Sequence, residues 1–325
     1  MSAARRHVLV FRALPDDQLA RIAALHEVTV AEPRKGAAQK AAFEAALPGA
    51  DALIGSSHPV TPALLDMAPR LRVISSVSVG VDNYPVAELR RRGITLCHTP
   101  GVLTETTADT VFSLVMATSR RLVELANLVR EGRWDRNIGE DLFGWDVHGK
   151  TLGILGFGRI GQAVARRAAL GFGMAVKYHS RHPVAVPELA GRAVHVPLDE
   201  LLAGCDIVVA TLPLTDQTRG LMGPREFGLM RPGAIFVNGG RGATVQESAL
   251  LQALDAGRLR AAGLDVFATE PLPLDSPLRT HPRVTALPHI GSATHETRHA
   301  MARLATTNLL QALAGEKPAA VYEGG

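Results

Sequence analysis

The sequence contains little cysteine and no apolar segment long enough to span a membrane. Of 325 residues only two are cysteines, Cys97 and Cys205, and they lie far apart in the chain. That excludes a disulfide framework and indicates two small core residues. The first residues also lack the basic region and apolar core of a signal peptide. These absences predict a soluble, cytoplasmic protein with no membrane partner.

The sequence also has no strong excess of acidic or basic residues. Its net charge is +4, with 20% charged and 46% hydrophobic residues, a composition typical of globular proteins. Basic residues are spread out except at Arg90–Arg92, which more simply end a helix than bind nucleic acid. No nucleic-acid partner is expected, while the modest basic excess suits small anionic ligands.

Residues 7–98 alternate short apolar runs with helical patterns. Thr61 and Pro62 are suited to the N-cap and first position of a helix, and Gly93 to a helix end. Strands are expected at 7–11, 27–31, 52–55, 72–77 and 94–97, with helices at 15–25, 37–47, from 62, and at 86–92. This alternation is typical of a parallel, flavodoxin-like α/β domain.

The regular alternation ends at Thr99-Pro100-Gly101. A long helix is expected from about Val102 to Arg130, followed by an irregular stretch at 132–149 that contains Trp134, Phe143 and Trp145. Aromatic residues make up only 4% of the chain, so this concentration indicates either a subunit contact or local packing.

The stretch 151–161 predicts a strand that runs into a helix through Gly156, Gly158 and Gly161. The first glycine suits a tight turn, the second lets a pyrophosphate approach the backbone, and the third lets the helix pack close to the strand. The helix N-terminus then offers N–H groups to the phosphates. The pattern favours a dinucleotide site; an ordinary glycine-rich turn is the alternative.

A second βα series continues from this motif. Strands are expected at 151–155, 175–178, 207–211, 234–238, 262–266 and 284–287, and a final helix at 293–314. The predicted fold class is α/β, with two Rossmann-like or flavodoxin-like domains, parallel sheets and an interdomain cleft. Residues 1–98 and 291–325 are expected to form a substrate-binding domain, and residues 99–290 an NADP-binding Rossmann domain.

The end of the second strand in this series indicates which cofactor is bound. An Asp or Glu there would accept hydrogen bonds from the adenine ribose. Between the end of this strand and Glu188 the chain has no acidic residue. Ser180 and Arg181 occupy the position instead, followed by His182. Arginine presents a planar fork of donors that suits a phosphate. NADPH (NADP+) is therefore the predicted cofactor, and a solvated basic loop is the alternative.

Three chemically active residues follow predicted strands in the same half of the chain: Arg241, Glu270 and His289. Ligands of open parallel sheets gather at the carboxyl ends of the strands. Arginine can hold a carboxylate in a bidentate manner, histidine can donate a proton to a carbonyl oxygen, and a glutamate can orient that histidine. The set suits reduction of a 2-oxo acid, although each residue alone is equally typical of structure.

A competing motif, His295-Glu296-Thr-Arg-His299, matches the zinc pattern His-Glu-x-x-His and would indicate a metallohydrolase. Only Glu316 and Glu323 remain downstream as further carboxylate ligands, so the first turn of a helix is the favoured interpretation and no metal site is expected. A non-catalytic NAD(P)H-binding sensor of the same fold is the second alternative.

Seven motifs together resemble the D-isomer-specific 2-hydroxyacid dehydrogenase family, in its glyoxylate/hydroxypyruvate reductase branch. The similarity covers almost the whole chain and rests on residues 13–17, 78–82, 102–109, 156–161, 234–242, 262–267 and 288–298. The resemblance implies reduction of glyoxylate, hydroxypyruvate or 2-ketogluconate to a D-2-hydroxy acid.

The resemblance also implies roles for individual residues. Arg241 would bind and polarise the substrate, Glu270 would support the histidine, and His289 would donate the proton. The backbone of Val79 and Gly80 would hold the substrate carboxylate. The residues expected along the cofactor are Gly156, Gly158, Arg159, Ile160, Gly161, Ser180, Arg181, Pro213, Gly239 and Asp265.

The family's fold implies a homodimer formed largely through the cofactor domain. Some reductases of this group insert an aromatic side chain of the partner subunit into the active site, whereas this chain has Asp141 at that position.

Recognition of substrate hydroxyls is expected from the loop Gly55–His58, because its polar side chains would be left unpaired by the methyl group of pyruvate.

Overall fold

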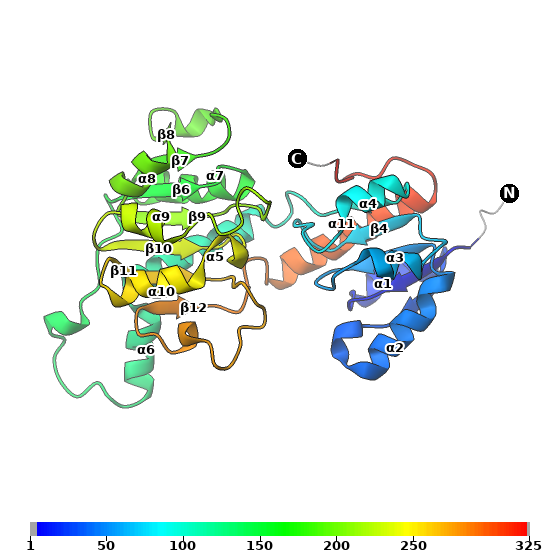
Figure 1. Ribbon diagram of the computed structural model, residues 1–325, viewed down its shortest axis with the longest axis horizontal. Helices are drawn as coiled ribbons and strands as arrows, with labels where there is room; N and C mark the ends of the chain where they lie inside the picture. The colour runs from blue at the N-terminus through cyan, green and yellow to red at the C-terminus, as the bar shows by residue number, and fades with distance from the viewer. Residues whose placement is uncertain (1–4, 324–325) are drawn as a thin grey trace. The chain divides into compact units, whose positions relative to one another are not determined.

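The computed structural model describes residues 5–323, which divide into two compact units. Unit 1 comprises the chain up to Leu103 and again from Ala293, and unit 2 comprises Thr104–Ser292. Each unit contains one parallel β-sheet with helices on both faces (Figure 1). The predicted α/β fold class is therefore confirmed. Among the described residues, no helix is both long and apolar enough to cross a membrane.

The sheet of unit 1 has the order β2-β1-β3-β4-β5. Its strands are β1 His7–Val10, β2 Glu27–Val30, β3 Ala52–Gly55, β4 Val73–Ser76 and β5 Thr95–Cys97. The helices are α1 Asp16–Ala23, α2 Ala37–Ala46, α3 Pro62–Asp66, α4 Val86–Arg91 and α11 His295–Leu313. Helix α11 packs on β3, β4 and β5, so the end of the chain returns to the first sheet as expected.

Local sequence explains these elements. Strands β3 and β4 are buried along their whole length, as expected for parallel strands covered on both faces. The Thr61 side chain accepts a hydrogen bond of 3.2 Å from the N–H of Leu64, which confirms it as the N-cap of α3. Gly93 has φ +68°, the left-handed conformation that ends a helix. Both cysteines are buried.

The sheet of unit 2 has the order β12-β11-β10-β9-β6-β7-β8. Its strands are β6 Thr151–Leu155, β7 Ala175–His179, β8 Ala193–His195, β9 Ile207–Ala210, β10 Ala234–Asn238, β11 Leu259–Leu264 and β12 Val284–Ala286. Strand β8 had not been predicted, because it has three residues at the sheet edge and is only partly buried. The other strands are confirmed with shifts at their ends.

The two faces of this sheet carry separate apolar cores. Helices α5 Thr104–Ser119 and α7 Arg159–Arg166 cover one face, and α8 Leu198–Gly204, α9 Pro224–Leu229 and α10 Glu247–Asp255 the other (Figure 1). Helix α5 lies so close to the sheet that a Cβ on Gly263 would meet the Thr118 hydroxyl at 2.6 Å. Helix α5 is thus central to unit 2.

The single long helix expected from Val102 to Arg130 is wrong. The chain forms α5, which ends at Ser119, and a separate helix α6 Leu122–Arg130. Arg121 between them has φ 55°, a left-handed conformation that no α-helix contains. The carbonyl of Ser119 accepts its hydrogen bond from the N–H of Trp145 at 2.9 Å instead of from the following turn. A returning segment thus ends the helix, and local propensity did not reveal it.

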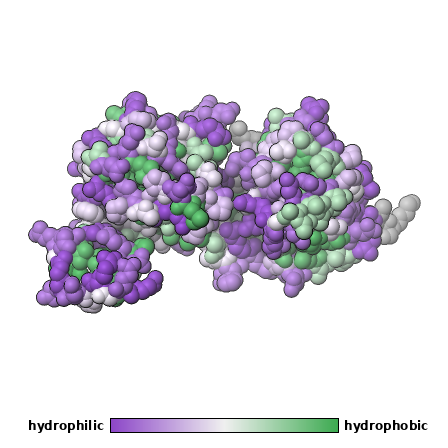
Figure 2. All heavy atoms as spheres, turned by 60° about the horizontal axis from the view of Figure 1, so that its bottom comes forward, coloured by the Kyte–Doolittle hydropathy of each residue, from purple (hydrophilic) through white to green (hydrophobic). Residues whose placement is uncertain are grey.

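Helix α6 and residues 131–146 form an extended segment of unit 2, which we call the arm (Figure 1). The lobe at the lower left of Figure 2 carries hydrophobic patches among hydrophilic residues. Large apolar side chains are exposed along the arm, among them Leu122, Val123, Val129, Trp134, Ile138, Phe143 and Trp145. Exposed apolar residues gathered on one segment are typical of a surface that another molecule covers.

Candidate active site

The strand order of unit 2 places most of the predicted site residues along one edge of the sheet. Gly156 follows β6, Pro213 follows β9, and Gly239 follows β10. Asp265 directly follows β11, and His289 follows β12. Because all these strands are parallel and adjacent, their carboxyl ends form a continuous row. This is the edge where open α/β sheets bind ligands.

The glycine loop has the geometry that its residue types predict. Gly156 has φ +91°, and Thr211 on the neighbouring strand end donates a 2.7 Å hydrogen bond to its carbonyl. A Cβ on Gly161 would lie 2.3 Å from that same carbonyl oxygen, so only glycine allows α7 to approach. A Cβ on Gly158 would meet nothing within 4 Å. Arg159 and Ile160 begin α7 and present its N-terminal amides.

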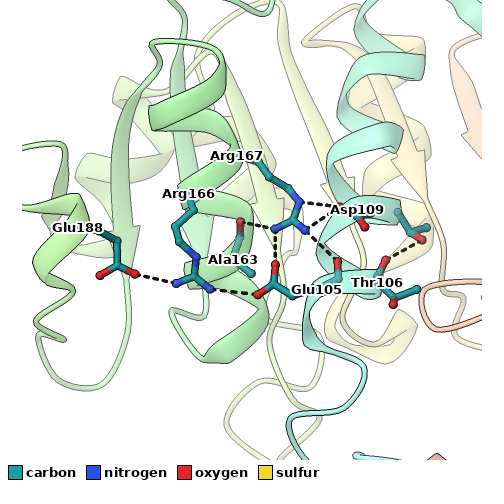
Figure 3. Close-up of polar contacts among 8 residues, drawn as sticks. Glu105, Thr106, Asp109, Ala163, Arg166, Arg167 and Glu188 are labelled. Carbon is teal, nitrogen blue, oxygen red and sulfur yellow. Dashed lines mark hydrogen bonds and ion pairs between the residues drawn. The ribbon is translucent and has the colours of Figure 1, made fainter. Parts of the chain in front are cut away.

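An ion cluster joins α7 to α5 at the end away from the glycine loop (Figure 3). Arg167 pairs with Asp109 at 2.6 Å and with Glu105 at 2.9 Å. Arg166 pairs with Glu105 at 3.3 Å and with Glu188 at 3.2 Å. A single exposed pair contributes only about 0–1 kcal/mol. Here the pairs are connected, and they hold α5, α7 and the segment after β7 together.

The loop after β7 contains no carboxylate that could bind a ribose. Ser180 Oγ donates a 2.6 Å hydrogen bond to the carbonyl of His182, and the ring of His195 lies 3.0 Å from the carbonyl of Ser180. Arg181 is exposed, and its side chain has no ion pair within the described part of the chain. The exposed guanidinium of Arg181 offers donors that suit a phosphate group, whereas the hydroxyl proton of Ser180 is already donated to the carbonyl of His182.

A cavity of about 220 Å³ opens beside this loop, and the sequence did not reveal it. Its walls are apolar, made by Phe157, Leu189 and residues of the segment 184–193. The Phe157 ring stacks on Tyr178 with centroids 3.7 Å apart. Phe157 belongs to the glycine loop, and its position in that motif was the only feature of the sequence that could have indicated the cavity. An open apolar hollow of this size suits the face of a nucleobase.

Asp265 is buried, with 2% of its surface exposed, and its carboxylate anchors the loop after β12. It accepts hydrogen bonds from the N–H of Ile290 at 2.8 Å and of Gly291 at 2.9 Å. Burial raises the pKa of Asp265, although the two N–H donors and the nearby His289 oppose that effect. The sequence had placed Asp265 only along the cofactor; the structure also gives it this anchoring contact.

His289 and Glu270 form the shortest polar contact of this loop. His289 Nδ1 lies 2.6 Å from Glu270 Oε2, while Glu270 Oε1 accepts a 3.0 Å hydrogen bond from the N–H of Phe267. His289 has φ 55°, which is rare outside glycine and costs free energy. Asp265 holds the two residues that follow His289. The imidazole is therefore held toward the carboxylate, with Nε2 left for another partner.

Arg241 is half-buried and close enough to Glu270 to act on it electrostatically. Partial burial opposes ionisation of Glu270, but hydrogen bonds from His289 and Phe267 and the charge of Arg241 outweigh it, so the pKa of Glu270 is lowered. A Cβ on Gly242 would lie 1.8 Å from the carbonyl carbon of Phe267. Only a glycine there lets the two loops touch. The structure thus brings Arg241, Glu270 and His289 together.

The substrate-binding residues predicted in unit 1 follow β4. Val79 and Gly80 are partly exposed, and in the described part of the chain neither N–H makes a hydrogen bond. Ser78 fixes the turn, because its hydroxyl donates to the carbonyl of Gly80 at 2.7 Å, and its carbonyl accepts from Thr99 at 2.9 Å. Two neighbouring free amides are suited to binding an anion.

The loop Gly55–His58 does not offer the side chains that we expected. The hydroxyls of Ser56 and Ser57 accept hydrogen bonds of 2.6 and 2.8 Å from Nη1 of Arg12. The His58 ring packs edge-on against Phe43 with centroids 5.4 Å apart, and burial lowers its pKa. These groups already have partners in the fold, so direct pairing of all three with substrate hydroxyls is not supported.

The zinc motif lies on the first turns of α11, whose N-cap is Thr294. His299 contacts Asp17 of α1, with Nε2 and Oδ2 3.0 Å apart, and so serves in helix packing. No group of three or more possible metal ligands occurs among residues 5–323. The geometry gives the metallohydrolase alternative no support.

The site has the parts of a dinucleotide-dependent oxidoreductase: a glycine loop before a helix, and an Arg, Glu and His gathered at the same sheet edge. A family model, "D-isomer specific 2-hydroxyacid dehydrogenase, NAD binding domain", matches residues 112–291. The chain therefore belongs to the D-isomer specific 2-hydroxyacid dehydrogenase family and is an enzyme, an oxidoreductase with a nicotinamide-cofactor domain.

Named relatives agree with this assignment. The chain is 51% identical over 312 residues to glyoxylate/hydroxypyruvate reductase B of Citrobacter koseri, covering 95% of both chains. It resembles a Thermus thermophilus protein of known structure, with a TM-score of 0.88, 43% identity and coverage of 97% and 99%. A Sinorhizobium meliloti NADPH-dependent glyoxylate/hydroxypyruvate reductase, crystallised with NADP and malonate, gives a TM-score of 0.86, 30% identity and coverage of 98% and 97%.

The lowered pKa of Glu270 predicts a pH-dependent contribution to stability. Its carboxylate stabilises the fold above the unfolded-state pKa of about 4.3, and this contribution disappears as the pH falls through the lower folded-state pKa. The wild-type protein should therefore have a higher Tm than Glu270→Gln above about pH 4.3, with the difference shrinking in more acidic buffer. Thermal unfolding of both proteins across this range measures the effect.

The exposed Glu316 supplies a control for this measurement. Glu316→Gln should follow the wild-type Tm throughout the pH range. A Tm difference between the wild-type protein and Glu270→Gln that stays constant with pH would contradict a stabilising charge on Glu270.

Proposed function

We propose that this enzyme reduces short 2-oxo acids to D-2-hydroxy acids with NADPH, and that glyoxylate, hydroxypyruvate and 2-ketogluconate are its substrates. The observation that carries the proposal is the 2.6 Å contact between His289 and Glu270 beside Arg241, at the carboxyl edge of the unit 2 sheet. The names of the relatives from Citrobacter koseri and Sinorhizobium meliloti support glyoxylate and hydroxypyruvate as substrates. The proposal of 2-ketogluconate comes from the family resemblance of the sequence.

Each residue of the set has a chemical task. Arg241 binds the substrate and polarises its carbonyl through the guanidinium donors. His289 donates the proton to the carbonyl oxygen from Nε2, the ring nitrogen that faces away from Glu270. The Glu270 carboxylate orients the imidazole through its 2.6 Å contact with Nδ1. The nicotinamide cofactor supplies the hydride when it is bound.

The two free amides after β4 would bind the substrate carboxylate next to the reacting carbonyl. The N–H groups of Val79 and Gly80 make no hydrogen bond in the described part of the chain, which leaves them available to the substrate carboxylate. In this proposal unit 1 is the substrate-binding domain and unit 2 the cofactor domain. A non-catalytic sensor would have no need for the strained His289 and its short contact with Glu270.

The cofactor residues would divide along the dinucleotide. Gly156, Gly158 and Gly161, with Arg159 and Ile160 at the start of α7, would receive the pyrophosphate. Ser180 and Arg181 would bind the 2′-phosphate of NADPH. Pro213, Gly239 and Asp265 would lie toward the nicotinamide. The apolar cavity beside Phe157 supports a place for the adenine.

The substrate assignment is tested with the wild-type enzyme, NADPH and a series of 2-oxo acids. Hydroxypyruvate and 2-ketogluconate should be reduced with a higher kcat/KM than pyruvate; for hydroxypyruvate, the names of the relatives support this order. The product from hydroxypyruvate should be D-glycerate by chiral chromatography. Turnover of none of these acids would favour the sensor, and L-glycerate would contradict the family's stereochemistry.

His289→Ala completes this test. Loss of a general acid lowers kcat by about 10²-fold or more, while NADPH binding, followed by fluorescence titration, should survive. Near-normal turnover of hydroxypyruvate by this variant would remove His289 from the role of proton donor.

The proposed 2′-phosphate site predicts cofactor preference. NADPH should exceed NADH by at least about tenfold in kcat/KM, the equivalent of one charge-assisted hydrogen bond. Arg181→Ala should remove most of this preference by weakening NADPH alone. Arg192→Ala, which removes another exposed arginine of the same domain, should retain the preference. Equal efficiency of the two cofactors in the wild-type enzyme would contradict the assignment.

We also infer that two copies associate through the arm, α6 with residues 131–146. Its exposed side chains include Trp134, at 60% exposure, and Phe143, at 53%. Sedimentation equilibrium should give the mass of two chains for the wild-type protein and a shift toward one chain for the double variant Trp134→Ser, Phe143→Ser. Leu274→Ser, exposed elsewhere at 87%, should not shift it. A wild-type protein at the mass of one chain would contradict this inference.

A further inference from the structure

Three arginines gather at the carboxyl edge of the unit 1 sheet. Arg12 follows β1, Arg34 follows β2, and Arg298 lies on the first turns of α11, which packs on the same sheet. They are close enough to influence one another: burial and the charge of Arg34 lower the pKa of Arg12, and burial and the charge of Arg12 lower that of Arg298. None of the three forms an ion pair within residues 5–323.

Two serine hydroxyls hold the Arg12 guanidinium in place and leave some of its N–H donors available. Its Nη1 donates to the hydroxyls of Ser56 and Ser57 at 2.6 and 2.8 Å. A guanidinium has five N–H donors, and in the described part of the chain Nη2 and Nε of Arg12 make no hydrogen bond. The serine hydroxyls are neutral acceptors, so they orient the guanidinium without neutralising it.

The second arginine fixes the same loop. Arg34 Nη1 donates to the carbonyl of Ser57 at 2.7 Å, and Ser57 has φ 65°, a left-handed conformation that is unfavourable for serine. Two arginines thus hold a strained loop at the end of β3. Strain of this kind is found mainly where the surrounding structure serves a function.

One carboxylate lies near the cluster. The charge of Glu32 partly opposes the lowering of the pKa of Arg12. However, Oε1 of Glu32 already pairs with Lys35 at 2.8 Å. Arg298 is half-buried, and no hydrogen bond of its side chain occurs among the described residues. Three like charges therefore remain together with little compensation. An anion that binds between them would relieve the repulsion and replace lost hydration.

We propose that Arg12, Arg34 and Arg298 form a second anion site, and that this site selects 2-oxo acids that carry a phosphate or carboxylate at the end far from the reacting carbonyl. The proposal rests on the proposed function, in which Val79 and Gly80 hold the carboxylate next to that carbonyl. In this proposal the three arginines, and not the hydroxyls of Ser56 and Ser57, recognise the far end of the substrate.

The sheet geometry sets the length of such a substrate. The order β1-β3-β4 places β1 two strands away from β4, and neighbouring strands lie about 4.8 Å apart. The ends of β1 and β4 are thus about 10 Å apart. An extended six-carbon chain, with bonds of about 1.5 Å, spans about 6 Å between its end carbons. A hydrogen bond of about 2.9 Å at each end extends this reach to about 12 Å. A six-carbon acid with a terminal anion can therefore contact both the free amides and the arginines.

Two matched substrate pairs test the selection and distinguish the two anions. The phosphate pair is 2-keto-6-phosphogluconate and 2-ketogluconate, and the carboxylate pair is 2-oxoadipate and 2-oxohexanoate. In the wild-type enzyme the kcat/KM of at least one charged member should exceed that of its partner by about tenfold or more, the effect of one charge-assisted hydrogen bond. The pair with the larger ratio identifies the anion.

Variants assign the ratio to the arginines. Arg12→Gln and, separately, Arg34→Gln should reduce the charged-to-uncharged ratio to near one, because each removes a positive charge and leaves most of the side-chain volume. Arg34 is exposed, so Arg34→Gln tests the proposal even if the half-buried Arg12 is needed for folding. Arg21→Gln is the control; this exposed arginine of α1 contacts Gln18 and Thr307 and should keep the wild-type ratio.

Calorimetric titration with inorganic phosphate separates this proposal from the proposed function. The wild-type protein should bind phosphate at least about tenfold more tightly than Arg12→Gln or Arg34→Gln does. If the enzyme reduces hydroxypyruvate but both substrate ratios are near one, the second anion site is overturned and the proposed function stands. If it reduces no 2-oxo acid, the proposed function fails, and equal phosphate binding by the wild-type protein and variants then overturns the anion site as well.

Discussion

A buried carboxylate sets the conformation of the candidate active site. Asp265 accepts two hydrogen bonds from the backbone just after His289, and so holds that histidine at φ 55°. Such a backbone conformation costs about 1–3 kcal/mol, and persists because the surrounding contacts require it. The consequence is the 2.6 Å contact of His289 with Glu270. The geometry of the proposed proton donor therefore depends on Asp265, which does not itself contact the imidazole in the described hydrogen bonds.

Close backbone approaches supply the rest of the preorganisation. Gly242 lets the Arg241 loop rest on the backbone at Phe267, and Gly161 lets α7 approach the carbonyl of Gly156. Neither approach leaves room for a Cβ, so the sequence at these points is dictated by sterics. The ion cluster of Arg166 and Arg167 then fixes α7 to α5. Close contacts of this kind fix the positions of the loops that would hold a dinucleotide.

The sequence predicted what depends on local pattern and missed what depends on distant contacts. Apolar periodicity located the strands, and glycine spacing located the dinucleotide loop. The break at Arg121 was missed because it depends on Trp145 returning to cap Ser119. The partners of the Ser56 and Ser57 hydroxyls in the loop after β3 were also missed, because they contact Arg12, a residue more than forty positions away. Polar side chains near a site do not reveal in sequence which partner they have.

Two groups of arginines, one in each unit, differ in whether a carboxylate pairs with them. In unit 2 Arg166 and Arg167 pair with carboxylates, which makes them structural. In unit 1 Arg12 and Arg298 lose hydration, lie close enough for the charge of Arg12 to lower the pKa of Arg298, and have no ion pair in the described chain. Burying like charges next to one another costs free energy, because each loses hydration and repels the other. Under the proposal of a second anion site, an anion that arrives with the substrate would supply the compensation that Glu32 gives only in part.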